Sequence, residues 1–279
     1  MPAVRDALTK GNAVHLRLLH TLYRSRPVPF VYWSAVHRVV KRLVSVGDPL
    51  FSEPPSVHGG VLRDPRLQDL LRHDALGAWS LDPGTIDLVW SHVLTRQPRT
   101  ILECGAGSST LVLGKYLETA GVPGALAVSV EQDLPYKEEI ERRLATSGLQ
   151  HFVRVLHAPL SADHSYQLDP LTMKAQLGSR KADLLVIDGP SGRPGCRVWT
   201  LPLLAPFCRQ GTRWFLDDAF RDGEVSVLRA WAATRGVSVE GIYPIGKGLA
   251  TGVIEQPEGV TFEAVTRALG RAPSAARPA

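Results

Sequence analysis

The chain has 279 residues, of which 44% are hydrophobic and 21% are charged, with a net charge of +5. This composition is that of a globular protein with one large domain and an extension. No basic stretch is interleaved with aromatic residues, so we expect no nucleic acid among its partners. The cysteines Cys104, Cys196 and Cys208 are widely spaced without a Cys-x-x-Cys, so the sequence supports neither a disulfide framework nor a thiolate zinc site. No signal peptide and no run of roughly 18 apolar residues is present, so we expect a cytoplasmic protein.

Residues 1–78 differ from the rest of the chain. Apolar residues at near-helical spacing predict two helices there, one around Leu8–Leu22 and one around Tyr32–Leu43. We expect a helical extension that forms a lid over an active site or a dimer contact; in the second case the protein would be a homo-oligomer. Because basic residues dominate the first fifty positions, contact of residues 1–46 with a membrane surface is an alternative that we favour less.

From Ser80 onward, strands and helices alternate. A helix is expected to start at Asp82 and Pro83, a capping side chain followed by a proline at the first helical position. The last two strands have no helix between them and should form an antiparallel hairpin at one edge, whereas the others should pair in parallel. We expect a domain over residues 79–258, then a C-terminal helix and disordered tail over 259–279. Strands are expected at 100–103, 126–130, 152–156, 183–187, 213–216, 237–243 and 249–254, and helices at 108–120, 136–147, 168–177, 196–208 and 221–235.

A glycine-rich turn follows the first of these strands. The apolar run ends in Glu103, the turn contains Gly105 and Gly107, and the next helix opens at Ser108 and Ser109. Glycines let the backbone approach a ligand closely, and the free N–H groups of a helix start point into the same gap. The segment therefore predicts a cofactor pocket.

Acidic residues stand at the ends of most of the parallel strands, where ligands bind in such sheets. Glu131 lies one strand–helix unit beyond the turn, at the position where an acid accepts two hydrogen bonds from a ribose diol. Thr110 replaces the third glycine of a dinucleotide fingerprint, and Glu103 would repel a pyrophosphate but suits an ammonium group. These features favour S-adenosylmethionine over NAD as the cofactor. The strand ends are Glu103, Glu131, His157–Ala158, Asp188 and Asp217–Asp218.

Four motifs in order resemble the class I S-adenosylmethionine-dependent methyltransferases: Glu-x-Gly-x-Gly-x-Ser, Ser-Val-Glu, Val-Ile-Asp-Gly-Pro and Phe-Leu-Asp-Asp-Ala. The subgroup they resemble most is the small-molecule O-methyltransferase-like proteins, over residues 78–255. The resemblance implies an α/β Rossmann-like three-layer sandwich with a seven-stranded, mostly parallel sheet of order 3-2-1-4-5-7-6, strand 7 antiparallel. It implies that the glycines and Glu103 hold the methionine part, that Glu131 holds the ribose and that His157–Ala158 border the adenine. The implied cofactor-binding residues are Glu103, Gly105, Gly107, Ser108, Ser109, Glu131, Ala158 and Asp188.

Asp188, Asp217 and Asp218 should converge, since the fourth and fifth strands are neighbours in this order. Three close carboxylates repel one another unless a proton or a cation lies between them, and hard oxygen ligands favour Mg²⁺, Ca²⁺ or Mn²⁺. We therefore name these three as candidate metal ligands; such an ion would lower the pKa of a bound hydroxyl. In the alternative, Asp188 orients cofactor or substrate and Asp217–Asp218 cap the next helix.

Asp188 and His157 are the candidate catalytic residues, with His157 as a general base where no metal activates the hydroxyl. Arg193 and Arg197 are candidates for binding an anionic substrate or are solvated loop residues, and Lys247 is either functional or a solvated turn residue. The expected reaction is methyl transfer to an oxygen of a small molecule, such as a sugar, phenol or other natural-product hydroxyl. The alternatives are an NAD(P)-dependent oxidoreductase and a non-catalytic binding protein with this fold.

Overall fold

The computed structural model describes residues 62–77, 80–219, 221–243 and 245–270. The helices predicted in the first 61 residues and the tail from residue 271 lie outside these ranges. Within the described ranges, no helix is both long and apolar enough to span a membrane.

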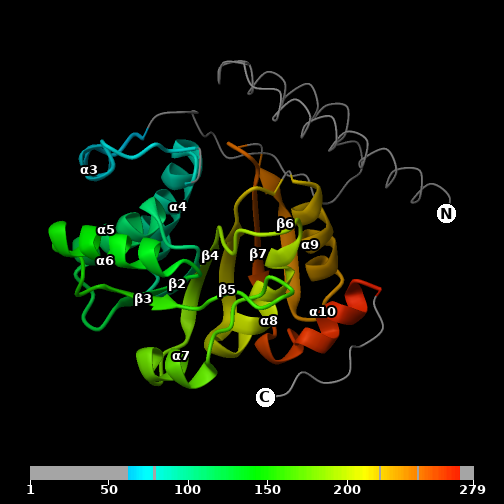
Figure 1. The fold of residues 1–279 in the computed structure, drawn as a ribbon. Helices are drawn as coiled ribbons and strands as arrows, with labels where there is room; N and C mark the ends of the chain where they lie inside the picture. Colours follow the sequence, from blue (N-terminus) through cyan, green and yellow to red (C-terminus); the bar gives the residue numbers. More distant parts are fainter. Residues whose placement is uncertain (1–61, 78–79, 220, 244, 271–279) are drawn as a thin grey trace, which may run out of the picture.

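Seven strands form one sheet in the order β3-β2-β1-β4-β5-β7-β6, as predicted. The strands β1 to β5 pair in parallel, whereas β7 runs antiparallel between β5 and the edge strand β6. The carboxyl ends of the parallel strands therefore lie along one edge, which is the upper edge in Figure 1. The strands are β1 (Thr100–Cys104), β2 (Leu126–Glu131), β3 (Val153–His157), β4 (Ala182–Ile187), β5 (Cys208–Leu216), β6 (Val237–Tyr243) and β7 (Leu249–Ile254).

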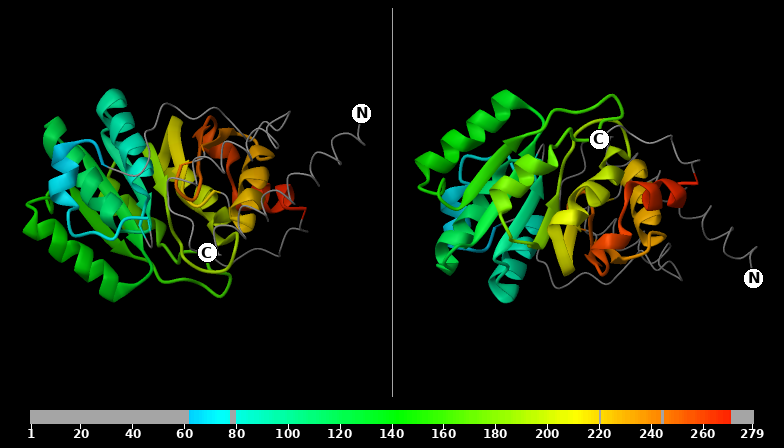
Figure 2. Two further views of the ribbon diagram at one scale, coloured as in Figure 1. Left: turned by 90° about the horizontal axis from the view of Figure 1, so that it is seen from above. Right: turned by 90° about the horizontal axis from the view of Figure 1, so that it is seen from below.

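Helices cover both faces of the sheet and give the three layers seen in Figures 1 and 2. One apolar core lies between the sheet and the helices α3 to α6, and a second lies between the sheet and α7 to α10. These helices are α3 (Pro65–Leu70), α4 (Pro83–Arg96), α5 (Ser108–Ala120), α6 (Leu134–Thr146), α7 (Pro170–Leu177), α8 (Thr200–Leu204), α9 (Asp222–Ala232) and α10 (Phe262–Ala268), with short 3-10 turns at Cys196–Trp199, Ala205–Phe207 and Pro257–Gly259.

An aspartate cap with a proline at the first or second helical position starts four of the described helices, α3, α4, α6 and α7. Asp82 accepts the N–H of Gly84 at the start of α4, and Asp133 and Asp169 do the same for α6 and α7. Proline fits the first turn because its missing N–H would have no intrahelical partner there. The predicted start of α4 and the predicted bounds of α5 are confirmed.

The predicted helix over 196–208 is wrong as a continuous element. The segment forms a 3-10 turn, the five-residue α8 and a second 3-10 turn, because Pro202 and Pro206 remove helical N–H donors. The following strand β5 begins at Cys208, five residues before the predicted start. The polar stretch 209–212 hides this beginning from an apolar-pattern analysis.

Candidate active site at the carboxyl ends of the strands

The glycine turn between β1 and α5 lies against the end of β4. Gly105 has a φ of +86°, and a Cβ on it would lie 2.7 Å from the backbone nitrogen of Gly189. Its N–H donates to the Val130 carbonyl of β2 at 2.9 Å. Glycine is thus required at position 105 by its backbone conformation and by the close approach of the segment after β4. From the sequence alone, this glycine is predicted only from the close approach of a ligand.

Glu103 lies buried beneath this turn, with 1% of its surface exposed. Its Oε2 accepts a hydrogen bond of 2.5 Å from the Thr110 hydroxyl, whose oxygen accepts the Gly107 N–H at 2.8 Å. Burial raises the pKa of Glu103 to about 7, although Ser109, Thr110 and Ser129 oppose the rise by hydrogen bonding. A cation bound beside this carboxyl group would favour its ionised form.

Glu131 joins the turn to the beginning of α6. Its Oε2 accepts the N–H of Ala106 at 3.0 Å, and its Oε1 accepts the N–H of Asp133 at 2.8 Å. Each oxygen keeps a second lone pair with which it can accept a further hydrogen bond. The buried Ala158 donates its N–H to the Glu131 carbonyl at 2.8 Å, so the residues expected beside ribose and adenine are neighbours here.

Ser108, the first residue of α5, is held by a pair of residues that the sequence analysis missed. Its hydroxyl donates to the Asp74 carboxylate, which also accepts hydrogen bonds from Arg143 at 2.6 and 2.7 Å. Asp74 precedes α4 and Arg143 lies on α6, so the cofactor-side helix start is tied to two other elements. No local motif marks either residue, since they lie 69 positions apart.

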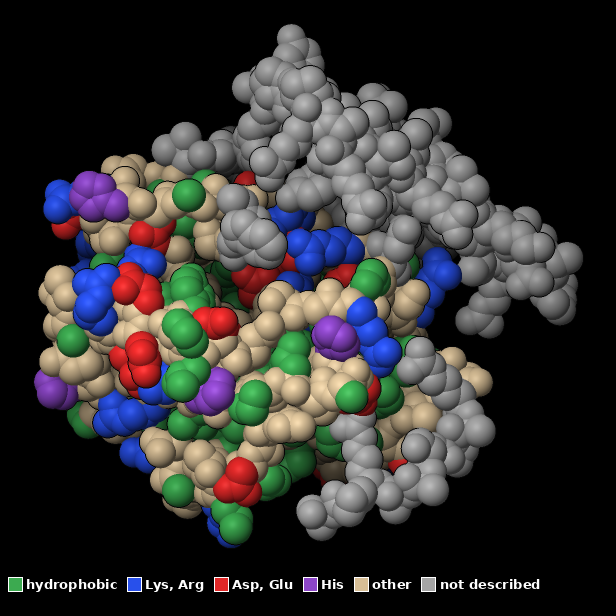
Figure 3. Space-filling model, in the orientation of Figure 1, with side chains coloured by type: hydrophobic (Ala, Val, Ile, Leu, Met, Phe, Trp, Pro, Cys, Tyr) green, Lys and Arg blue, Asp and Glu red, His purple; other side chains and the backbone are tan. Residues whose placement is uncertain are grey.

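The three aspartates after β4 and β5 converge as predicted. One carboxylate oxygen from each of Asp188, Asp217 and Asp218 lies within 4.8 Å of the others. Asp217 and Asp218 are each 1% exposed. We call these three residues the acid cluster. Figure 3 shows acidic and basic side chains side by side over the upper ends of β4 and β5.

Cationic side chains of the chain itself contact the acid cluster. Arg197 Nη2 lies 3.2 Å from Asp188 Oδ1 and 3.1 Å from Asp218 Oδ2. Lys247 Nζ lies 3.0 Å from Asp218 Oδ1, and Arg221 Nη2 lies 3.0 Å from Asp218 Oδ2. The solvated positions considered for Arg197 and Lys247 are therefore wrong, because their side chains are only 4% and 8% exposed.

The cations determine how the acids ionise. Burial raises the pKa of Asp217 well above its usual value, and the neighbouring negative charges add to the rise. Burial acts in the same direction on Asp218, but Arg197, Lys247 and Arg221 together hold the pKa of that residue below its usual value. The donor atoms and their spacing suit a divalent metal ion, yet the ammonium of Lys247 lies among them. The residues present do not fit an additional ion, and we derive no step through one.

His157 does not join the acid cluster. It ends β3, opposite Glu131 of β2, whereas Asp188 follows β4, and the sheet order places β2 and β1 between these two strands. Three strand spacings correspond to about 14 Å. The His157 Nε2 is 3.1 Å from the Gln132 carbonyl oxygen. The two predicted catalytic residues therefore follow strands that are three positions apart in the sheet, and we assign no base role to His157.

Tyr166 is a further residue of the site that the sequence analysis missed. Its hydroxyl is buried and makes no hydrogen bond with the residues that the structure describes. A Cβ on Gly189 would lie 2.1 Å from that hydroxyl oxygen, so the side chain reaches the segment after Asp188. A single tyrosine in a loop carries no sequence pattern that could have identified it.

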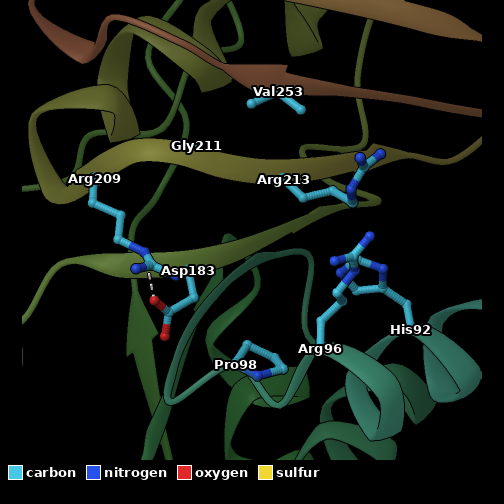
Figure 4. Close-up of a pocket in the computed structure, with 8 residues that line it drawn as sticks. All are labelled: His92, Arg96, Pro98, Asp183, Arg209, Gly211, Arg213 and Val253. Atoms are coloured by element: carbon cyan, nitrogen blue, oxygen red, sulfur yellow. Dashed lines mark ion pairs between the residues drawn. The ribbon is translucent and has the colours of Figure 1, made fainter.

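A separate cavity of about 390 Å³ lies on the α4 side of the sheet, near the amino ends of β4 and β5 (Figure 4). Arg209 pairs with Asp183 at 2.7 Å on one side of it. His92 and Arg96 extend from α4 toward Arg213 of β5. Because ligands of such sheets bind at the carboxyl ends, this cavity is not the cofactor site.

Comparison with known proteins agrees with this geometry. Residues 102–219 match a family model described as a methyltransferase domain. This segment runs from β1 past the end of β5 and so contains the glycine turn, Glu131 and the acid cluster. No curated protein matches the chain.

Solved structures with the same fold include several methyltransferases. The O-methyltransferase TomG from Streptomyces achromogenes, involved in tomaymycin synthesis and solved with S-adenosylmethionine, is 17% identical with a TM-score of 0.52, covering 82% of this chain and 100% of its own. An O-methyltransferase from Bacillus cereus in complex with S-adenosylhomocysteine is 20% identical with a TM-score of 0.54; the match covers 80% of this chain and 98% of the Bacillus chain. The Podospora anserina methyltransferase PaMTH1, bound to S-adenosylhomocysteine, is 15% identical with a TM-score of 0.54; the match covers 83% of this chain and 99% of PaMTH1. At these identities the likeness shows the fold.

Proposed function

We propose that the chain is a class I S-adenosylmethionine-dependent methyltransferase and that it methylates an oxygen atom of a small molecule. The observation that carries the proposal is the position of Asp188, directly after β4 and in contact with the glycine turn through Gly189. Asp188 thus lies beside the glycine turn and is itself a member of the acid cluster. Two of the methyltransferases that share the fold act on oxygen, which supports the same acceptor atom here.

In this proposal the glycine turn and Glu103 hold the methionine end of the cofactor, whose ammonium group interacts with the buried carboxylate. Glu131 accepts hydrogen bonds from the ribose hydroxyls with the lone pairs that its backbone contacts leave unused. Ser108, Ser109 and Ala158 complete the cofactor site. The sulfonium of S-adenosylmethionine supplies an activated methyl group, so the protein contributes mainly proximity and orientation.

Asp188 receives the proton of the acceptor hydroxyl. As the acceptor oxygen forms its bond to the methyl carbon, the bond from that carbon to sulfur breaks and S-adenosylhomocysteine is released. The hydroxyl proton passes to the Asp188 carboxylate and from there to solvent. The Asp188 side chain is 18% exposed, which allows this exchange. Burial raises the pKa of Asp188, which makes its carboxylate a better proton acceptor, and the contact with Arg197 opposes this rise.

The test combines cofactor binding with a screen of acceptors. Calorimetry should detect binding of S-adenosylhomocysteine but not of NADH. Purified enzyme with S-adenosylmethionine and panels of phenols, sugars and hydroxylated natural products should yield a product heavier by one CH₂ and methylated on oxygen. Methylation of nitrogen or carbon only, or binding of NADH alone, would overturn the proposal.

A further inference from the structure

One of the positive charges at the acid cluster comes from the turn between β6 and β7. Lys247 Nζ lies 3.0 Å from Asp218 Oδ1 and 3.9 Å from Asp217 Oδ2, and these three side chains are at most 8% exposed. We propose that the Lys247 ammonium is the resident cation of the acid cluster, and that methyl transfer by this chain needs no divalent metal. The inference rests on the proposed function, because it concerns the group beside the acceptor oxygen.

The fold fixes this turn from two sides. The Ala219 N–H, directly after the acid cluster, donates to the Gly248 carbonyl at 2.9 Å. On the other side, a Cβ on Gly246 would lie 2.5 Å from the Cβ of Asp82, which caps α4. The turn is therefore clamped between the end of β5 and the start of α4. These two contacts hold the turn in place, and the Lys247 ammonium therefore lies against the acid cluster.

Cationic side chains of the chain itself already contact the acids of the cluster. Three carboxylates face three cationic side chains, of which Arg197 and Lys247 are buried and Arg221 is 44% exposed. A divalent ion would add two positive charges and would require ligand positions that Lys247 now contacts. Buried charges are stable only when they are paired, so displacing the ammonium from its partners would be costly.

This arrangement makes a prediction about metal binding that does not depend on turnover. The probe is Mn²⁺ alone, added to the full-length protein after treatment with a chelator, with binding followed by electron paramagnetic resonance and thermal unfolding. Wild-type protein should bind no stoichiometric Mn²⁺, and its unfolding temperature should be the same in Mn²⁺ and in chelator. Lys247→Ala should gain one bound Mn²⁺ per chain, and Mn²⁺ should raise its unfolding temperature by several degrees.

Two further variants control for general effects of charge removal. Lys137→Ala removes a lysine from the ion pair with Glu141 on the surface of α6 and should behave like wild type. Adding Asp217→Asn to Lys247→Ala should abolish the gained Mn²⁺ site. If Lys247→Ala does not fold, Lys247→Gln takes its place, and the wild-type titration decides alone if neither variant folds.

Stoichiometric Mn²⁺ binding by wild type, lost in Asp217→Asn, would overturn the inference, as would a folded Lys247→Ala that gains no Mn²⁺. Calorimetry with S-adenosylhomocysteine separates this failure from failure of the proposed function. Protein that binds S-adenosylhomocysteine and also Mn²⁺ would refute the resident ammonium and leave the methyltransferase assignment intact. Protein that binds neither S-adenosylhomocysteine nor Mn²⁺ would refute the proposed function and would support Lys247 as the resident cation.

Discussion

The Glu103 carboxylate accepts a 2.5 Å hydrogen bond from the Thr110 hydroxyl, and that hydroxyl oxygen in turn accepts the Gly107 N–H. A buried acid at the end of β1 therefore fixes the glycine turn through the third residue of α5. Threonine occupies the position of the third glycine in a dinucleotide fingerprint, and here it serves a structural purpose. The same carboxyl group is our candidate partner for the cofactor ammonium, so its ionisation should be linked to cofactor binding.

Cofactor affinity should increase as pH rises through about 7. Burial raises the pKa of Glu103 to about 7, and an ammonium partner requires the carboxylate, so binding must release a proton below this pH. The dissociation constant of S-adenosylhomocysteine should increase about tenfold for each pH unit below the pKa. Calorimetry between pH 6 and 8, in buffers of different ionisation enthalpy, measures both the constant and the released proton.

Glu103→Gln should remove this pH dependence and weaken binding at pH 8. The exposed Glu138 on α6 provides a control, since Glu138→Gln should retain the wild-type profile. An affinity of the wild type that is constant from pH 6 to 8 would show that Glu103 does not contact the ammonium.

Gly105→Ala should destabilise the protein far more than Gly121→Ala. Both glycines have positive φ, which costs an alanine about 1–2 kcal/mol. At Gly121 nothing lies within 4 Å of the added Cβ, whereas at Gly105 the Cβ meets the Gly189 backbone at 2.7 Å. We expect a loss of about 3 kcal/mol or more at Gly105. Urea unfolding measures both, and equal losses would contradict the tight contact between the turn and β4.

Glu131→Gln should weaken the binding of S-adenosylhomocysteine about tenfold or more. The amide nitrogen of glutamine cannot accept a hydrogen bond, so either the Ala106 N–H or the Asp133 N–H loses its partner, which costs about 1–3 kcal/mol. The ribose contact is tested separately with the 2′-deoxy analogue of S-adenosylhomocysteine. Wild type should prefer the natural ribose, and Glu131→Gln should lose this preference. If the variant still prefers the natural ribose over the 2′-deoxy analogue, Glu131 does not contact the ribose and only fixes the backbone.

The sequence predicts the fold well because its signals are local. Asp82 with Pro83 starts α4 and Gly121 ends α5, and each acts through its own backbone conformation. The order of the strands came instead from the resemblance to a family. The prediction fails over 196–208, where Pro202 and Pro206 interrupt an apolar pattern that would otherwise suit a helix.

The acid cluster shows what sequence patterns miss. Convergence of Asp188 with Asp217 and Asp218 follows from strand order, so it was predicted correctly. The partners of these acids lie elsewhere: Arg197 is on a 3-10 turn, and Lys247 is on a turn that comes close only because β7 pairs with β5. Neither position has a local motif that distinguishes a buried ion pair from a solvated side chain. The separation of His157 from Asp188 likewise depends on the two strands that lie between them.

His92, beside the cavity on the α4 face, should make the protein less stable in acid. Burial lowers its pKa from 6.5 to about 4, and the nearby Arg213 and Arg96 add to the effect. Between these two values the unfolded chain binds a proton that the folded chain does not. Stability should therefore fall as pH decreases from about 6.5 toward 4. Glu103 acts in the opposite direction, because its raised pKa favours the folded state at low pH, so the contribution of His92 must be obtained by difference.

His92→Gln isolates that contribution. The ring of His92 packs edge-on against Phe215 at 5.2 Å, so the variant should lose some stability at every pH through lost packing. The deficit relative to wild type should shrink as pH falls from 7 to 5, since glutamine has no proton to gain in the unfolded chain. Urea midpoints at several pH values measure the difference, with His73→Gln, which alters an exposed residue after α3, as the control. A deficit that stays constant with pH would mean that His92 is protonated equally in both states, and that Arg96 and Arg213 do not act on it as the geometry of the cavity indicates.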